Sequence, residues 1–245
     1  MDHSQQAVAL GLDSPRHLLI GGELRETKDH LVSVDPSTGE SLAEVPNAAV
    51  GEVSAAVAAA RDAFDHSDWR RNISLRKRSL LALSELARRD SERLALTDCL
   101  DVGMLSVVAR RFGVKALVRN LEYFSTWADK VYGELVPVTS GRIMDFTRRE
   151  PYGVVAAVYA WNTPSLFLGS KLGPALAAGN TVVVKPSELG SLSALHFASL
   201  CIEAGLPPGV VNIITGGPDC GRQLVAEPGL DKISFTGGTE TGRRV

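Results

Sequence analysis

The sequence predicts an α/β protein with a doubly wound, Rossmann-like parallel sheet, amino-terminal helices and a protruding β-hairpin. The second half contains four short apolar runs without polar alternation, at 153–160, 181–184, 210–214 and 232–235. Between them lie segments with helical spacing, at 166–178, 192–204 and 220–226. Unbroken apolar runs that alternate with helices are typical of parallel strands covered on both faces. Such sheets bind ligands at the carboxyl ends of their strands.

Composition and charge exclude several classes of partner. The 245 residues are 44% hydrophobic and 22% charged, which is ordinary for a globular protein with a sizeable core. The formal net charge of −2, from 26 basic and 28 acidic residues, predicts no nucleic-acid partner and no anionic membrane partner. The basic segment 70–78 is therefore interpreted as a solvated helix face, and a phosphate site there is the less favoured alternative.

The cysteines indicate a reducing compartment. The sequence contains three cysteines, Cys99, Cys201 and Cys220, which lie far apart and form no CxxC or zinc-ligand pattern. We therefore expect a cytoplasmic protein without a metal site. Cys220 lies in a glycine turn beside Asp219, whose charge raises a thiol pKa, and we interpret it as structural. The start of the chain has neither a secretion signal nor an apolar segment long enough to span a membrane.

The first half is predicted to contain small strands followed by helices. Residues 1–16 are polar and aperiodic and are expected to form a flexible leader, whereas alternating runs broken by glycine and proline predict small strands up to residue 46. From about 50 to 131 the apolar spacing predicts three or four amphipathic helices, with Ser74 and Ser91 as N-caps. Residues 17–132 and 151–245 are expected to form one domain.

In residues 133–150, apolar and polar residues alternate again on both sides of Ser140-Gly141. This pattern predicts two strands joined by a turn. An isolated two-stranded ribbon cannot bury both of its faces. We therefore expect it to dock on another subunit or on a distant part of the chain.

Polar residues follow the first two predicted parallel strands. Asn162 comes directly after the first, where its amide could donate to a developing oxyanion or could cap the next helix; spacing does not separate these alternatives. Lys185 and Glu188 follow the second, three residues apart across a proline turn. A lysine donor and a carboxylate acceptor suit the hydroxyl groups of a ribose, and they equally suit a surface ion pair.

Glycine-rich loops follow the third and fourth strands. Neither 216–221 nor 237–242 continues into Lys-Ser or Lys-Thr, which disfavours a P-loop, and GxGxxG is absent after the first strand. A glycine loop at the start of a helix exposes backbone N–H groups to an anion, although a simple tight turn explains the same pattern.

Three motifs at successive strand ends together resemble the NAD(P)-dependent aldehyde dehydrogenase superfamily. They are "AWN" at 160–162, "KPSE" at 185–188 and "FTGGTETG" at 235–242, supported by "IGGE", "DPSTGE" and "PYGVV". The resemblance runs from about residue 18 to the last residue, in the order and spacing of the family. It implies the cofactor-binding, amino-terminal half of such an enzyme.

The resemblance implies roles for individual residues. Asn162 matches the asparagine that completes the oxyanion hole, and Lys171 matches a lysine that acts as a charge relay in some branches or merely orients polar groups. Glu188 matches the acceptor for the 2′-hydroxyl, which favours NAD over NADP because a carboxylate repels a 2′-phosphate. The implied cofactor-binding residues are Ala160, Trp161, Lys185, Pro186, Ser187, Glu188, Gly217, Phe235, Thr236, Gly237, Gly238 and Thr241.

The resemblance also implies partners and an incomplete enzyme. The ribbon at 133–150 falls at the family's oligomerisation hairpin, so a homo-oligomer is expected in the full-length protein, with an aldehyde as substrate. Gly238 stands where many members have serine, and "DVGML" at 101–105 departs from the frequent acidic-Thr-Gly-Lys-Pro. The catalytic domain with its nucleophilic cysteine and general-base glutamate is expected to be absent, so this chain alone should not oxidise an aldehyde. The alternatives are a short non-catalytic dinucleotide-binding or subunit-pairing module and, less favoured, a flavodoxin-like domain.

Overall fold

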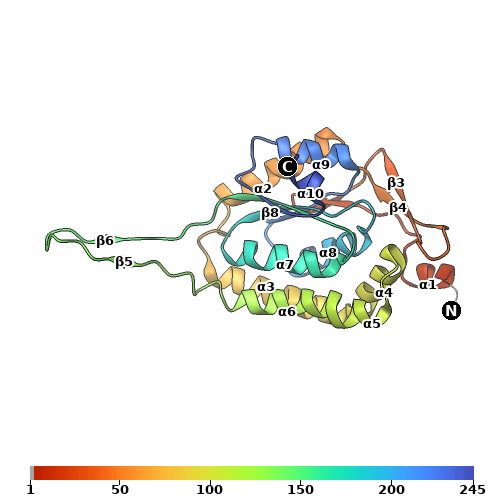
Figure 1. The fold of residues 1–245 in the computed structure, drawn as a ribbon, viewed down its shortest axis with the longest axis horizontal. Helices are drawn as coiled ribbons and strands as arrows, with labels where there is room; N and C mark the ends of the chain where they lie inside the picture. The colour runs from red at the N-terminus through yellow and green to blue at the C-terminus, as the bar shows by residue number, and fades with distance from the viewer. Residues whose placement is uncertain (1–2) are drawn as a thin grey trace.

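The computed structural model describes residues 3–245, and its centre is a six-stranded sheet in the order β10-β7-β8-β9-β1-β2 (Figure 1). The predicted parallel strands are confirmed as β7 (Val154–Tyr159), β8 (Thr181–Lys185), β9 (Val211–Ile213) and β10 (Lys232–Thr236). Strands β1 (Leu18–Ile20) and β2 (Glu23–Arg25) extend the sheet in antiparallel fashion. A separate hairpin consists of β3 (His30–Val34) and β4 (Ser41–Pro46).

Helices cover both faces of this sheet. One face carries α2 (Val50–His66) and α9 (Pro218–Ala226), which share an apolar cluster with the strands. The other carries α7 (Pro164–Ala177) and α8 (Leu192–Glu203), against which pack α3 (Ile73–Arg89), α4 (Ser91–Val102) and α6 (Lys115–Ser125) (Figure 1). A short α5 (Ser106–Val108) and a π-helix, η1 (Ala109–Val114), join α4 to α6. The central strands β7, β8 and β9 are therefore buried on both sides, as their unbroken apolar runs predict, whereas the edge strands β10 and β2 are more exposed.

The chain reverses its direction across the sheet after β9. Strands β7, β8 and β9 follow one another in space, with α7 and α8 on one face, whereas α9 crosses the other face and β10 returns to the far side of β7. The topological switch point therefore lies between β7 and β10. In open α/β sheets the ligand crevice forms at this point, outside the carboxyl ends of the strands.

The structure corrects two expectations for the helical region. Asn72, not Ser74, caps α3, because its side chain accepts a hydrogen bond from the Leu75 amide at 2.9 Å. Asp90 precedes α4 as its N-cap, and Ser91 is the first helical residue. Helix α3 begins at Ile73 and α4 at Ser91, so the residue in front of each helix, and not the predicted serine, takes the capping position.

The basic segment 70–78 is not uniformly solvated. Arg76 is buried, and its guanidinium donates to the backbone carbonyls of Ala177, Trp69 and Arg70. Burial lowers the pKa of Arg76. This side chain joins α3 to the end of α7, and the expectation of a purely solvated face was wrong for it.

The first described residues differ from a loose leader. Residues His3–Ala9 form helix α1, and Ala7 and Leu12 are buried in the main apolar cluster. His3 Nδ1 lies 2.6 Å from Asp35 Oδ2, and Arg93 donates to the Leu10 carbonyl at 2.9 Å. These contacts place the segment against α4.

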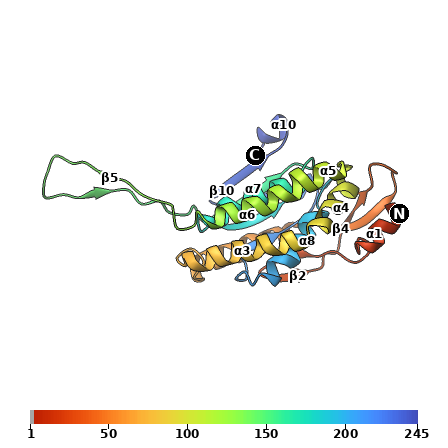
Figure 2. The same cartoon turned by 90° about the horizontal axis from the view of Figure 1, so that it is seen from below.

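The predicted ribbon is present and extends from the body as a long arm (Figures 1 and 2). Strands β5 (Leu135–Val136) and β6 (Asp145–Phe146) pair in antiparallel register. Apolar side chains on the arm are exposed, at Leu135, Ile143, Met144 and Phe146. Strand β10 and the short α10 (Thr239–Gly242) stand at the edge of the sheet and project from the body (Figure 2).

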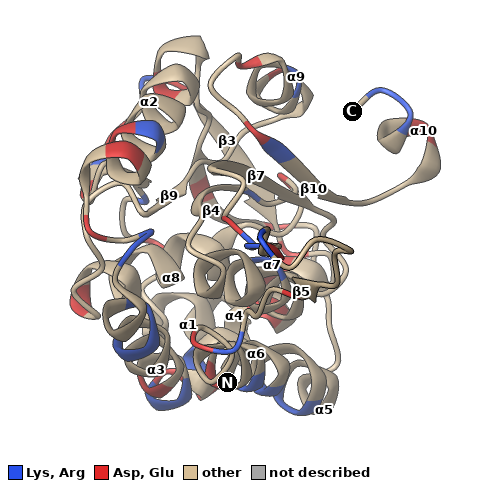
Figure 3. Ribbon diagram, turned by 90° about the vertical axis from the view of Figure 1, so that its left-hand side faces the viewer, with Lys and Arg blue, Asp and Glu red and all other residues tan. Residues whose placement is uncertain are grey.

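The surface carries charges of both signs. Lysine, arginine, aspartate and glutamate are interspersed along α2 and α3 (Figure 3). Within residues 3–245, no helix is both long enough and apolar enough to cross a lipid bilayer.

Candidate functional site

Three neighbouring strands contribute one side chain each to a row at the carboxyl end of the sheet. Val158 on β7 is in register with Lys185 on β8 and with Phe235 on β10. Residues in register on parallel strands point to the same face, so these three side chains share the face that α9 covers. Lys185 is the one charged member of this row.

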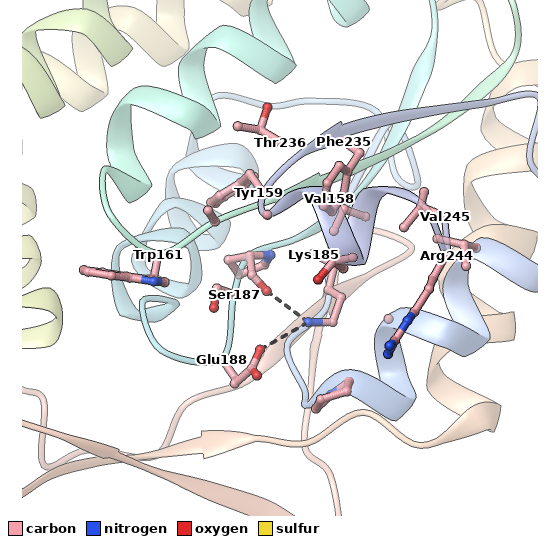
Figure 4. A pocket seen from close by; sticks show the side chains of 18 of the residues that line it. Val158, Tyr159, Trp161, Lys185, Ser187, Glu188, Phe235, Thr236, Arg244 and Val245 are labelled. Atoms are coloured by element: carbon pink, nitrogen blue, oxygen red, sulfur yellow. Dashed lines mark hydrogen bonds and ion pairs between the residues drawn. The ribbon is translucent and has the colours of Figure 1, made fainter.

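A cavity of about 560 Å³ lies above this row at the switch point (Figure 4). Its walls come from the residues that follow β7, β8 and β10 and from one face of α9. The structure brings together these predicted cofactor-binding residues: Ala160, Trp161, Lys185, Pro186, Ser187, Glu188, Phe235, Thr236, Gly237, Gly238 and Thr241. Segments up to about 80 residues apart in sequence thus meet at one crevice, as the fold predicts.

Lys185 is held in a buried position at the cavity floor. It is 4% exposed, and its Nζ donates to the Pro186 carbonyl at 3.2 Å. Burial lowers the pKa of Lys185, and nearby Cys220 and Glu188 oppose that shift. An ammonium with one backbone acceptor retains further donors that can reach a hydroxyl group in the cavity.

Glu188 faces Lys185 across the proline turn (Figure 4). Its Oε2 lies 3.9 Å from Lys185 Nζ, and about a third of the side chain is exposed. Ser187 supports the turn by accepting a hydrogen bond from the Leu189 amide at 3.3 Å. The donor and the acceptor therefore both line the cavity, and the ion pair between them is partly buried.

Small residues keep the cavity open. A Cβ atom at Gly221 would lie 3.5 Å from Lys185 Cε, and one at Gly237 only 2.5 Å from the Phe235 ring. At Gly238 a Cβ atom would meet no other atom within 4 Å. A side chain at 237 would therefore have to displace the Phe235 ring, while 238 has room for a serine.

The wall from α9 was missed by sequence reasoning. Pro218, Gly221, Arg222 and Val225 line the cavity together with Val158, Tyr159, Arg244 and Val245. The four residues on α9 recur at helical spacing on one face, which is the signal that could have identified them. Arg222 pairs with Asp219 at the surface of this helix.

Three predicted site residues lie outside the cavity, namely Asn162, Gly217 and Lys171. Asn162 is exposed in the bend after β7, and within residues 3–245 its side chain makes no hydrogen bond. Thr163 is the N-cap of α7, without a side-chain bond, so the helix-cap alternative for Asn162 finds no support. Gly217 precedes α9, and its amide donates to Asn47 Oδ1 at 3.3 Å.

Lys171 lies on α7, on the face of the sheet opposite the cavity. Its Nζ donates to Ser234 Oγ of β10 at 2.9 Å, and burial lowers its pKa. This contact joins α7 to the edge strand and leaves the lysine next to the uncovered side of β10.

The geometry defines an α/β protein with a ligand crevice at its switch point, and comparisons identify the family. The sequence model of the aldehyde dehydrogenase family matches residues 24–245. Mouse cytosolic aldehyde dehydrogenase 1 is 44% identical over 215 residues, which cover 86% of this chain and 43% of that relative. Human retinaldehyde dehydrogenase 3 is 42% identical over 233 residues, which cover 93% of this chain and 45% of that relative.

A solved structure agrees with these sequence matches. An aldehyde dehydrogenase from Bacillus cereus, determined as an NAD+ complex, has a TM-score of 0.93 and 36% identity, covering 96% of this chain and 49% of its own. This chain belongs to the aldehyde dehydrogenase family. It spans about half the length of these relatives.

Proposed function

We propose that this chain is the NAD-binding half of an aldehyde dehydrogenase that oxidises an aldehyde to a carboxylic acid. The observation that carries the proposal is the pairing of buried Lys185 with Glu188 inside the cavity at the switch point. The 2′- and 3′-hydroxyl groups of the adenosine ribose would accept from the ammonium and donate to the carboxylate. The Bacillus cereus relative, solved with NAD+, supports the same cofactor here.

The charge of Glu188 favours NAD over NADP in this proposal. A 2′-phosphate would lie next to the Glu188 carboxylate, and like charges at close range repel. Gly237, Gly238 and Thr241 line the cavity, and backbone N–H groups at this helix start would suit the pyrophosphate, without the hydroxyl that a serine at Gly238 would add.

We assign the nucleophile of this reaction to a part of the protein outside residues 1–245. Cys201 and Cys220 are buried, and burial raises the pKa of all three thiols, including Cys99. None of the three lines the cavity of about 560 Å³. A cysteine nucleophile requires an accessible thiolate, which none of these residues offers. Asn162, exposed at the end of β7, is free to donate its amide to an oxyanion formed on such a cysteine.

The arm at 133–150 supports assembly into a homo-oligomer. Its exposed apolar side chains and its two-stranded ribbon lack a partner among the described residues. A second copy of the protein would cover them. The three free cysteines and the cytosolic mouse relative support a cytoplasmic location.

Replacing Glu188 by alanine is expected to raise the dissociation constant for NAD about tenfold, because a charged acceptor for the ribose is lost. The affinity for NADP should change much less, so discrimination between the two cofactors should narrow. Titration calorimetry of the 245-residue chain with each cofactor measures both. Glu85→Ala, at an exposed position of α3, serves as the matched control. Unchanged NAD affinity in Glu188→Ala would contradict the ribose assignment.

A further inference from the structure

A cluster of buried polar side chains lies behind the carboxyl end of β7. Asp98 of α4 is 0% exposed, and neither of its carboxyl oxygens has a hydrogen-bond partner among residues 3–245. The hydroxyl groups of Ser165, Ser193 and Tyr159 are also buried and unpartnered within that range. Because buried polar groups are normally paired, this cluster costs the fold stability and calls for a functional reason.

Asp98 lies beside the first turns of two helices. Ser165 is the second residue of α7 and Ser193 the second of α8, and both hydroxyl groups lie near Asp98 without the geometry of a hydrogen bond. Asp101, one turn further along α4, accepts hydrogen bonds from the Leu192 amide at 2.9 Å and from Ser33 Oγ at 2.7 Å. Helix α4 thus presents two buried carboxyl groups to helix starts, where the helix dipoles favour negative charge.

These helix starts follow the two loops that line the cofactor cavity. The loop with Trp161 leads into α7, and the loop with Lys185 and Glu188 leads into α8. A Cβ atom at Gly190 would lie 3.1 Å from the Trp161 carbonyl oxygen and 2.6 Å from Val102 of α4. The two loops and α4 are therefore packed against one another without spare room.

We propose that Asp98 is a positioning residue, whose ionised carboxyl group at the first turns of α7 and α8 fixes the Trp161 loop relative to the Lys185–Glu188 loop. Protonation removes the charge that faces both helix dipoles and the two serine hydroxyl groups, and the loops loosen. The consequence for cofactor affinity rests on the proposed NAD site. The loop geometry itself does not.

The electrostatic surroundings make the charge of the Asp98 carboxyl group sensitive to pH near neutrality. Burial raises the pKa of Asp98 to about 7, the hydroxyl groups of Ser165 and Ser193 oppose the shift, and Asp101 adds to it. The titratable groups that interact with it are Asp101 and Cys99 of α4 and Tyr159 of β7. Helices α7, α8 and η1 face it with Ser165, Ser193 and Gly113, which do not titrate.

The sign of the stability effect follows from this raised pKa. The folded state favours the protonated acid, so the contribution of Asp98 is most favourable below its ordinary pKa of 3.8 and is lost as pH rises through about 7. Above pH 7 the protein holds a buried charge at the expense of stability. Asp98→Asn removes that charge with little change in shape and should not lower stability at pH 8.

The first experiment compares NAD binding and thermal unfolding of the wild-type chain and Asp98→Asn at pH 6 and pH 8. Wild type is expected to bind NAD about fivefold more weakly at pH 6 than at pH 8, and Asp98→Asn to show the weak value at both. Its melting temperature at pH 8 should equal or exceed that of wild type. Asp68→Asn, at an exposed position, is the matched control. The proposal is overturned if Asp98→Asn binds NAD as tightly as wild type at pH 8. It is also overturned if Asp98→Asn binds NAD weakly and has a lower melting temperature than wild type at pH 8.

A second experiment reports on the loop without any cofactor. Of the three tryptophans, Trp69 is fully buried, so replacing Trp127 by phenylalanine leaves exposed Trp161 as the responsive fluorophore. Its emission should change with a midpoint near pH 7, and the change should be absent in Asp98→Asn and in Trp161→Phe. A transition that persists in Asp98→Asn, or none in the parent, overturns the proposal. If the wild-type chain binds no NAD, the proposed function fails, while this measurement still decides the role of Asp98.

Discussion

Replacing Asn162 by alanine is expected to lower kcat by about 10² to 10³ in a protein of the relatives' full length, because one oxyanion donor is lost. The dissociation constant for NAD should stay nearly constant, since Asn162 does not line the cofactor cavity. Stability should also stay constant, because the exposed side chain makes no hydrogen bond within residues 3–245. Steady-state NADH formation, NAD titration and thermal unfolding together measure the three effects.

A second asparagine provides the control for this prediction. Asn72→Ala removes the side-chain cap of α3, at the Leu75 amide, and should cost about 1 kcal/mol of unfolding free energy with kcat unchanged. Asn162→Ala is therefore expected to lower turnover and leave stability unchanged, whereas Asn72→Ala is expected to lower stability and leave turnover unchanged. Weaker NAD binding with normal turnover in Asn162→Ala would assign that residue to the loop structure instead of the reaction.

Replacing Gly169 by alanine is expected to lower the unfolding free energy by about 3 kcal/mol, because the added methyl group overfills a close helix contact. A Cβ atom there would lie 2.6 Å from Leu117 Cα, in the backbone of α6. Gly173, one turn later, is similarly confined, with Phe124 at 2.8 Å and the Asn120 carbonyl oxygen at 3.1 Å. The two glycines let α6 and α7 pack backbone to backbone. Denaturant unfolding followed by circular dichroism measures the loss.

Gly51 provides the matched control for this substitution. It lies in the first turn of α2, where an added Cβ atom would meet no other atom within 4 Å. Gly51→Ala should raise stability by up to about 1 kcal/mol, since alanine has the higher helix propensity. Equal effects at Gly169 and Gly51 would show that α6 and α7 can separate at little cost.

The parallel strands could be predicted from the sequence, whereas their order in the sheet is known from the structure. Unbroken apolar runs such as 181–184 appear only where both faces of a strand are covered, and β8 is buried throughout its length. The polar residues directly after these strands had to meet at one edge, which is why Lys185, Glu188 and Thr236 all line the cavity. The order of the strands then places that edge at the switch point.

Other features could not be predicted, since they depend on contacts between distant segments. Ser74 has the right chemistry for a cap, but α3 begins at Ile73, so Asn72 occupies the capping position. The wall from α9 shows helical periodicity, yet nothing local indicates that it faces Lys185 instead of solvent. The expectation of a loose leader gave too little weight to the apolar run at 7–12, from which Ala7 and Leu12 join the core.

The strands, the helices between them and the residues at the strand ends follow from the sequence, because these depend on local periodicity and on turn chemistry. Which charges are buried depends on the packing of the whole chain. Arg76 in a basic segment and Asp98 on an amphipathic helix have ordinary surroundings in sequence, but one meets the end of α7 and the other meets Ser165 and Ser193. The cost of burying a charge is set by neighbours in space, and those neighbours are up to about 100 residues away along the chain.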